Sequence, residues 1–358
     1  DRKGIQVAGI IDCASPYVIE DIESFLKTGE AYEIKDGGII YKDKVCIILG
    51  SEVETSEINE DGKTGSAHNL CYFPSLEDIK AFSKEMTKYI KNITLSTQRA
   101  RISAYELIDV AERYNGILVP AHVFTPHKSF YGNCTKRLER IFKEKFNKIF
   151  AIELGLSADT YLADQISELE TRTFITDSDA HSLPKIAREY NKMLLEDISF
   201  KEIVKALKNE DGRKILANYG LDPKLGKYHR TYCEECDKPL EGKPPVIKCD
   251  TCDSKKVVMG VLDRIEIIKD KKESISPNNR PPYIYQVPLT FVPGLGNKTI
   301  DKLLNNFETE MNILHKLSKD DIEAVVGEKN ANTIELARTG RMHIQSGGGG
   351  VYGKLTAS

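Results

Sequence analysis

Residues 1–215 alternate short apolar runs with amphipathic segments, and several of the apolar runs end in a carboxylate or an imidazole. The runs have the length and β-branched content of buried strands, and the segments between them space their apolar residues as helices do. This alternation favours a parallel β/α architecture, closed or nearly closed into a barrel. Because such barrels assemble their sites from the carboxyl ends of several strands, we expect the polar side chains at these ends to converge.

The same patterns predict the individual elements. Strands are expected over 7–11, 45–49, 117–119, 149–154 and 173–176, with 37–41 and 45–49 forming a hairpin. Helices are expected from Pro16 onward and over 75–90, 104–114, 138–146, 160–169 and 199–208. Ser75 and Ser199 stand where helix N-caps are expected, since a serine side chain can bond the free backbone N–H groups there.

Carboxylates and imidazoles at or near the strand ends form a candidate metal centre. They are Asp12, Glu52, His68, His122, Asp179 and His181. Asp179 and His181 lie two residues apart after a strand, so that both can face one hard or borderline metal ion. Taken singly, an Asp can instead cap a helix and a His can be a core residue bonded to backbone. Glu153, at another strand end, could position a ligand.

These groups are too many for one tetrahedral site, so the sequence predicts a cluster of about two or three divalent ions, with Glu52 as the bridging carboxylate. Zn²⁺, Mg²⁺ or Mn²⁺ would suit the mixed oxygen and nitrogen ligands. Such a cluster lowers the pKa of a bound water and stabilises a leaving oxyanion. We therefore expect phosphoester hydrolysis, with Asp179, His181 and Glu52 as the catalytic side chains.

The cysteines fall into two populations. Cys13, Cys46, Cys71 and Cys134 are scattered, as small buried hydrophobes in a reducing compartment would be. The others form C-x2-C-x12-C-x2-C, whose two knuckles can close a tetrahedral thiolate site: Cys233, Cys236, Cys249 and Cys252. A structural Zn²⁺ is expected there, with disulfide pairs as the alternative. Because the surrounding module is too small for a core of its own, its folding should depend on the metal.

The C-terminal part is expected to be helical. Residues 291–296 form a hydrophobic-Pro-Gly-hydrophobic-Gly turn ahead of an amphipathic helix, as in helix-hairpin-helix elements. Gly294 and Gly296 would leave backbone N–H groups open to a DNA phosphate, and Lys298 adds charge. An ordinary turn between packed helices is the alternative. The Gly-rich tail is either a flexible end or a loop that a nucleic-acid backbone can approach, with Tyr352 available for stacking.

Four further side chains are candidate DNA contacts. His127 and Lys128 follow His122 in one loop, and Lys185 and Arg188 lie in a segment expected to be a helix. A solvated loop or helix face is the alternative for each.

Composition limits the partners that can be argued globally. The formal net charge of -3 gives no overall attraction to nucleic acid, so a DNA partner has to be argued from local patches. No apolar run approaches the roughly 20 residues that span a bilayer, and the start does not look like a signal peptide, so no membrane partner is expected. The chain has no initiator Met and opens almost directly into a strand, which predicts an N-terminally truncated piece.

In one order along the chain, these motifs resemble the endonuclease Q family, most closely its bacterial, Bacillus-type branch. Segments 9–12, 50–52, 120–127, 153–157 and 178–182 are similar to the PHP phosphoesterase domain of that family. The match continues through 226–229, the four cysteines, the turn at 293–296 and the tail at 352–353.

The resemblance implies a distorted β/α barrel of the PHP type over 1–215, a zinc-finger module over 216–272 and a helical DNA-binding domain over 273–358. It implies that the candidate centre residues are metal ligands. The implied activity is a DNA repair endonuclease that cuts duplex DNA 5′ of a deaminated base (uracil, hypoxanthine or xanthine) or of an abasic site. Such an enzyme would be cytoplasmic and associated with the nucleoid.

One feature departs from the family pattern. PHP domains begin with a strand carrying His-x-His, and this sequence has none. If the chain is a fragment, the missing strand would supply both imidazoles. Two other functions stay open: a small-molecule phosphatase of the histidinol-phosphatase kind, and a DNA-binding protein whose metal centre has decayed. The four-cysteine motif and the hairpin turn weigh against the phosphatase, because a small substrate needs neither.

Overall fold

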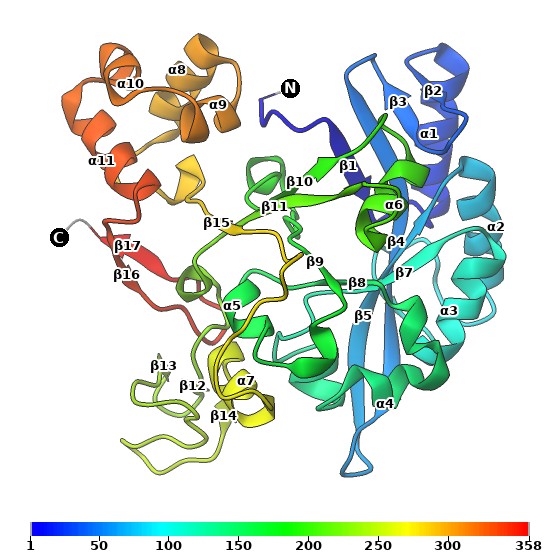
Figure 1. The fold of residues 1–358 in the computed structure, drawn as a ribbon, viewed down its shortest axis with the longest axis horizontal. Helices are drawn as coiled ribbons and strands as arrows, with labels where there is room; N and C mark the ends of the chain where they lie inside the picture. The colour runs from blue at the N-terminus through cyan, green and yellow to red at the C-terminus, as the bar shows by residue number, and fades with distance from the viewer. Residues whose placement is uncertain (1, 357–358) are drawn as a thin grey trace.

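The computed structural model describes residues 2–356, and its N-terminal half is built on one mixed sheet (Figure 1). The strands run in the order β2-β3-β4-β5-β7, and β1 and β6 each pair with β4. Their bounds are β1 Val7–Ile10, β2 Ala31–Glu33, β3 Ile39–Tyr41, β4 Val45–Ile58, β5 Thr64–Phe73, β6 Gln98–Arg99 and β7 Ile117–Pro120. β1 and β6 run parallel to β4, whereas β3, β5 and β7 pair antiparallel with their neighbours.

The long β4–β5 hairpin corrects the expectation of a parallel sheet. Its turn is built by Asn59, whose Oδ1 accepts hydrogen bonds from the backbone N–H groups of Asp61 and Lys63, and by Gly62 at φ 76°. An Asn side chain and a Gly with positive φ are what a chain reversal requires. The strand expected to end before Glu52 therefore continues to Ile58, and Glu52 lies within a strand rather than at its end. The expected hairpin of 37–41 with 45–49 is confirmed as β3–β4.

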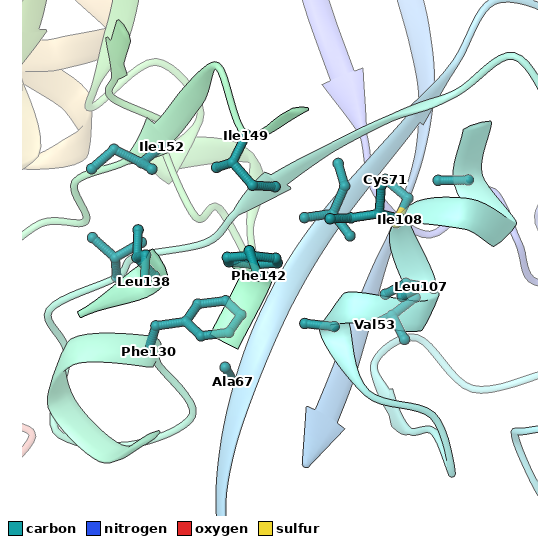
Figure 2. Close-up of a cluster of buried hydrophobic side chains, with 14 of the residues drawn as sticks. Val53, Ala67, Cys71, Leu107, Ile108, Phe130, Leu138, Phe142, Ile149 and Ile152 are labelled. Atoms are coloured by element: carbon teal, nitrogen blue, oxygen red, sulfur yellow. The ribbon is translucent and has the colours of Figure 1, made fainter. Parts of the chain in front are cut away.

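Alternation along this hairpin places Val53 and Ala67 on one face and Glu52 and His68 on the other. Val53 and Ala67 are fully buried, and Figure 2 shows them among the apolar side chains that pack against α3 (Ala104–Arg113). Glu52 and His68 adjoin them in sequence and therefore point to the opposite face. The core thus fixes the orientation of the polar side chains.

The helices that cover this sheet follow the expected pattern in part. α1 (Pro16–Thr28) and α2 (Leu76–Met86) are present, as is α6 (Phe200–Lys208), and the Ser75 and Ser199 side chains accept the N-cap hydrogen bonds expected of them. Two expected helices are shorter: α4 spans Leu138–Phe142 and α5 spans Thr160–Ala163, each followed by a 3-10 turn. None of the helices in residues 2–356 combines the length and apolar character that a membrane span requires.

The remaining strands of this half form separate small sheets. β8 (Ala151–Glu153) and β9 (Thr173–Ile175) pair in parallel, and β11 (Lys214–Gly220) lies between β10 (Tyr190–Leu194) and β15 (Tyr283–Tyr285). Within residues 2–356 the hydrogen-bonded strands therefore form several sheets and not one closed barrel. The architecture is mixed α/β, as expected in class but not in closure.

The cysteine-bearing module is small and lies at the lower left of Figure 1. It holds β12 (Tyr232–Cys233), β13 (Lys238–Pro239) and β14 (Val257–Val258), and α7 (Val261–Ile268) follows it. The buried apolar cluster at its centre contains only Leu240 beside two of the cysteines.

The segment after α7 is anchored to the N-terminal half. Asp270 accepts hydrogen bonds from the backbone N–H and the hydroxyl of Ser167. Further along, the Arg280 guanidinium donates to Asp164 Oδ1 at 2.9 Å, and both side chains are buried. The C-terminal part is therefore joined to the sheet by specific contacts as well as by the chain.

The C-terminal part is helical and ends in a two-stranded ribbon. Its elements are α8 Asn297–Phe307, α9 Glu310–His315, α10 Lys319–Val326, α11 Glu328–Arg338, β16 His343–Gln345 and β17 Lys354–Thr356. The Gly-rich tail packs on its own chain, since Gly347 N donates to Lys224 O and Gly353 N to Leu225 O. A Cβ on Gly347 would come within 2.4 Å of the Gly226 carbonyl oxygen, so glycine is needed here for backbone packing inside the protein. The expectation of a flexible end is therefore wrong.

Candidate metal centre

Glu52, His68 and His122 form one compact group, named here the Glu-His-His cluster. Each offers one ligand atom, and these atoms lie within 4.8 Å of one another. His68 Nδ1 is 3.1 Å from Glu52 Oε1 and 3.2 Å from His122 Nε2, and His122 Nε2 is 3.9 Å from Glu52 Oε2. Three of the side chains expected to converge do so, although they are far apart in the sequence.

His122 reaches the cluster through a strained backbone. It follows β7 at a φ of 29°, which a non-glycine residue rarely adopts. Its N–H donates to Glu153 Oε2 at 2.7 Å, and Gly155 lies so close that a Cβ there would approach His122 Cβ to 2.8 Å. Strain of this kind persists only where the surroundings fix it, and it gathers at functional sites.

The tautomer of His122 is set by Thr125. Thr125 Oγ1 lies 3.0 Å from His122 Nδ1, and it is placed to donate its one proton to a backbone carbonyl, that of His122 or His127. The hydroxyl oxygen then accepts from Nδ1–H, because it has no second proton. Nε2 is left with its lone pair facing the cluster, as a metal ligand requires.

The charges of the cluster also suit a cation. Burial tends to raise the pKa of Glu52, but the His68 hydrogen bond and charge, the charge of His122 and the hydroxyl of Thr97 outweigh it and lower that pKa to about 2. Burial lowers the pKa of His122, although the charge of Glu52 opposes this. At neutral pH the carboxylate is therefore ionised and His122 is neutral, the forms that bind a divalent ion.

Asp12 follows β1 and lies beside the cluster. It forms an isolated backbone bridge with Ser51, the residue before Glu52, and it lines the same small cleft as Glu52. The hydroxyl of Ser96 donates to Asp12 Oδ1 and holds the carboxylate at this cleft. Asp12 is thus near the Glu-His-His cluster without being part of it.

Asp179 and His181 differ in their placement. Asp179 follows β9 at a φ of 42°, and β9 pairs with β8, whose Glu153 accepts the His122 N–H, so the Asp179 loop begins close to His122, although Asp179 is not one of the clustered ligands. The His181 side chain is 79% exposed, and its Nδ1 is 3.7 Å from Asp179 Oδ1. The structure does not bring His181 into the cluster. The helix expected to follow is only a 3-10 turn, Leu183–Lys185.

Sequence analysis missed Asp177 and Glu189, each of which has a buried carboxylate oxygen with no hydrogen-bond partner. Burial, with the charge of Asp179, raises the pKa of Asp177 to about 6, and burial raises that of Glu189 to about 8. Glu153 has a pKa well above its usual value for the same reasons as Asp177. Asp177 could have been found from its spacing to Asp179, whereas Glu189 has no local signal because only the fold buries it.

Glu54 was also missed. Its Oε2 lies 3.6 Å from His68 Nε2 and 3.1 Å from Lys128 Nζ. It shares a strand face with Glu52, and the period of two would have revealed it had the strand been continued past Gly50. His68 Nε2 is buried and has no hydrogen-bond partner. An unpaired imidazole nitrogen among carboxylate oxygens fits a borderline divalent ion.

The four cysteines form a second metal-competent group. Their ligand atoms all lie within 4.8 Å, with Sγ–Sγ distances of 3.7 Å for Cys233–Cys252 and 3.8 Å for Cys236–Cys249. Tetrahedral Zn–S bonds of about 2.3 Å would set sulfur atoms about 3.8 Å apart. A disulfide would need about 2.05 Å, so the geometry favours the metal site over the disulfide alternative. The scattered cysteines are all buried, as expected.

The expected DNA contacts divide into exposed and engaged residues. Gly294, Gly296 and Lys298 are exposed, and nothing lies within 4 Å of a Cβ built on either glycine. His127 is exposed and packs edge-on against the Tyr228 ring, and Lys185 is also exposed. Lys128 forms an ion pair with Glu54, as described above.

The expectation of an exposed Arg188 and a free Tyr352 is wrong. Arg188 is 2% exposed, so it cannot reach a phosphate outside the protein. Its guanidinium donates to two backbone carbonyls and to the Tyr352 hydroxyl. The phenol is held in turn, since its ring packs edge-on against Phe291. Both residues were assigned to DNA because each was considered without its tertiary partner.

Two curated proteins are similar to the chain, while no protein-family profile matches it. An uncharacterised Bacillus subtilis protein, YqxK, is 44% identical over 356 residues, which cover 99% of this chain and 89% of that protein. An uncharacterised Methanocaldococcus jannaschii protein, MJ0043, is 38% identical over 253 residues, which cover 65% of this chain and 31% of that protein.

Two solved structures match nearly the whole fold. One is the lesion-specific endonuclease PfuEndoQ from Pyrococcus furiosus, with a TM-score of 0.82, 32% identity and coverage of 99% of this chain and 87% of that one. The other is endonuclease Q bound to a 27-mer duplex with an abasic lesion at the active site, with a TM-score of 0.85, 32% identity and coverage of 99% and 89%. The resemblance seen in the motifs therefore extends to the fold, and this chain belongs to the endonuclease Q family.

Proposed function

We propose that the chain is a metal-dependent DNA repair endonuclease that hydrolyses the phosphodiester on the 5′ side of a deaminated base (uracil, hypoxanthine or xanthine) or of an abasic site. The Glu-His-His cluster carries this proposal, because it offers a cation site in a fold shared with a DNA-bound endonuclease Q. Acting on chromosomal DNA, such an enzyme would work in the cytoplasm at the nucleoid.

Glu52, His68 and His122 would hold the ions, with Asp12 and Asp179 adding carboxylates from the flanking strand ends. Divalent ions such as Zn²⁺, Mg²⁺ or Mn²⁺ would supply Lewis acidity for activating water and for balancing charge on the phosphate. The nuclease needs this acidity because a phosphodiester is a poor electrophile and its leaving oxygen must be stabilised.

The surrounding residues would keep these ligands in place. Thr97 Oγ1 donates to Glu52 Oε1 at 2.5 Å and orients the carboxylate. Thr125 fixes the His122 tautomer, and Glu153 holds its backbone N–H. Such supporting bonds matter because a ligand that swings by about 1 Å can lose most of its catalytic value.

We also propose a PHP-type phosphoesterase domain over 1–215, a zinc-finger module over 216–272 and a helical DNA-binding domain over 273–358. The approach of the segments after β1, β7 and β9 to one centre supports the first, and the sulfur geometry supports the second. β11 pairs with β15 across these boundaries, so the units would fold against one another.

DNA would be gripped at the exposed turn over 293–296, read as the hairpin of a helix-hairpin-helix element. Gly294 is exposed and has φ 78°, and Lys298 in the first turn of α8 would add charge next to a bound phosphate. His127, Lys128 and Lys185 would lie along the strand near the metal centre. Extrusion of the damaged nucleotide would give selectivity, because a deaminated or absent base costs less to unstack.

A cleavage assay tests the proposal. A duplex with one uracil, hypoxanthine or abasic site is incubated with the chain and Mn²⁺ or Mg²⁺, and the labelled strand is sized. We expect a nick on the 5′ side of the lesion and none in the matched duplex. Asp179→Ala should abolish the nick with little loss of DNA affinity, while Asp320→Ala, an acid in the first turn of α10, should leave it intact.

Three results would contradict the proposal. Cleavage of p-nitrophenyl phosphate without nicking would indicate the phosphatase. Binding of the duplex without nicking would indicate a DNA-binding protein with a decayed centre. Nicking that survives Asp179→Ala would mean that the catalytic centre lies elsewhere.

A further inference from the structure

The loop that carries Asp179 is held by the buried Arg188 guanidinium. Nε donates to the Ser178 carbonyl at 2.6 Å, and Nη2 donates to the Asp179 carbonyl at 2.9 Å. The Ser178 hydroxyl adds a second tie, since it donates to the Glu189 carbonyl and accepts from Ala187 N. The two ends of the 178–188 segment are thus fastened together beside the metal centre.

The third nitrogen of Arg188 reaches the C-terminal tail. Nη1 donates to the Tyr352 hydroxyl at 2.8 Å, and the guanidinium also lies over the Tyr352 ring, 5.6 Å from its centroid. The Tyr352 ring is 5.7 Å from that of Phe291, edge-on. Phe291 ends the 3-10 turn Leu289–Phe291, which leads directly into the 293–296 turn. One line of contacts therefore runs from Asp179 to the proposed DNA grip.

A second line of contacts reaches the same 3-10 turn. Lys3 Nζ donates to the Pro184 carbonyl at 2.7 Å and pairs with Glu310. The Glu310 carboxylate accepts a hydrogen bond from Leu289 N at 2.9 Å. Both lines thus leave the 178–188 segment and end on Leu289–Phe291.

The segment needs outside support. Asp179 has a φ of 42°, which costs an Asp residue free energy, and residues 180–185 are exposed. A strained residue at the start of an exposed loop relaxes unless its neighbours are fixed from elsewhere. The Arg188 bonds to Ser178 and Asp179 supply this fixation, and Tyr352 holds the guanidinium in place.

We propose that Arg188 and Tyr352 are positioning residues for the metal centre: through them the C-terminal tail holds the Asp179 loop beside the Glu-His-His cluster. The role of Tyr352 is thereby to hold the Asp179 loop rather than to stack on a DNA base. This deepens the proposed nuclease function and rests on it. It also fixes the position of the Asp179 loop relative to the proposed DNA-binding turn at 293–296, because both are connected to the Leu289–Phe291 turn.

Tyr352→Phe tests the proposal, since it removes the hydroxyl and keeps the ring against Phe291. Tyr105→Phe is the matched control, because it also removes a hydroxyl that is hydrogen-bonded to another side chain, here Glu144, but on α3 away from the centre. Four quantities are measured on the full chain: amide hydrogen exchange of 178–188, Mn²⁺ affinity by paramagnetic resonance, single-turnover cleavage of the abasic duplex across a Mn²⁺ series, and DNA affinity.

We expect Tyr352→Phe to speed exchange at Lys185 to Arg188, whose amides donate within the loop, by about tenfold, the effect of losing one hydrogen bond to a charged group. Mn²⁺ affinity should fall, and the cleavage rate should fall at low Mn²⁺ and recover at high Mn²⁺. DNA affinity measured without added Mn²⁺ should not change. Tyr105→Phe should match the unaltered chain in all of these.

Unchanged exchange and unchanged Mn²⁺ affinity in Tyr352→Phe would overturn the inference. So would weakened DNA binding with normal exchange, which would return Tyr352 to the DNA surface. If the unaltered chain does not nick DNA, the proposed nuclease function fails, while the exchange and the Mn²⁺ affinity still decide whether Tyr352 positions the Asp179 loop.

Discussion

The Glu-His-His cluster and the four-cysteine group are built in opposite ways. Glu52 and His68 lie on the long β4–β5 hairpin, and the opposite face of this hairpin packs in the main apolar core. The cysteines sit on two short knuckles, and the apolar cluster beneath them includes little more than Leu240. The ligands of the first group are held by strands that pack on a large apolar core, whereas those of the second have only a small apolar cluster beneath them.

The difference predicts which of the two regions needs its metal ion in order to stay folded. A carboxylate and imidazoles held by a sheet can lose their ion and keep their places. Thiolates gathered from loops cannot, because little else opposes the entropy of the free chain. Four predictions test this contrast, beginning with the largest expected effect.

Loss of the thiolate metal should unfold the cysteine module alone. Cys249→Ser removes one ligand, and the lost binding free energy, on the order of 10 kcal/mol in zinc-finger peptides, is folding free energy for so small a module. Limited proteolysis should then cut between residues 232 and 258, while amide exchange over 45–73 stays slow. Thr251→Ala, in the same loop, is the control. Simultaneous loosening of both regions would break the contrast.

Loss of the Glu52 charge should impair cleavage and leave the fold intact. Glu52→Gln should reduce nicking of the abasic duplex by at least about a thousandfold, because the ligand at the middle of the cluster is gone. Thermal unfolding should change little, since the core face of the hairpin is intact. Glu20→Gln, on the exposed face of α1, controls for the charge change. A large drop in stability would mean that this cluster, too, organises the fold.

Acid should weaken the region just before the first knuckle. Burial lowers the pKa of His229 from 6.5 to about 4. The unfolded chain therefore takes up the proton first, so stability is full above about pH 6.5 and is lost as the pH falls towards 4, by about 3 kcal/mol in all. Denaturant unfolding at pH 7 and 5 should show a smaller difference for His229→Gln than for the unaltered chain or the exposed-site control His343→Gln. An equal loss of stability between pH 7 and pH 5 in all three proteins would contradict the prediction.

The smallest effect should come from a residue in neither metal group. Lys298→Ala should weaken DNA binding equally for damaged and undamaged duplexes and should reduce the slope of log affinity against log salt by about 1, as expected for one lost phosphate contact. Lys302→Ala, about one turn further along α8, is the control. Weaker binding of the damaged duplex only would place Lys298 at the lesion instead.

The residues whose neighbours are close in sequence were predictable. The cysteine spacing indicated its sulfur geometry, and Ser75 and Ser199 cap their helices as expected. The ends of apolar runs indicated Glu52 and His122, although Glu52 and His68 lie within β4 and β5 and not at strand ends. Periodicity indicates which face of a strand is buried, and spacing indicates which ligands one turn can bring together.

Residues that depend on distant pairing were not predictable. The antiparallel partner of β4 was hidden because the turn at 59–63 was not recognised, so Glu54 was missed. Arg188 and Tyr352 lie 164 positions apart, and neither carries a local sign that it bonds the other. His181 was assigned by spacing alone, and spacing does not reveal that its loop turns the imidazole outward.

The β4–β5 hairpin has a consequence for how this sequence can vary. Because neighbouring positions serve the core and the metal centre in turn, inserting a single residue into either strand would exchange the two roles along the rest of that strand. Length changes are therefore tolerable only in the exposed bend at 61–63, outside the paired residues of the two strands. Homologues should differ in size there and agree in spacing between each strand end and its ligand.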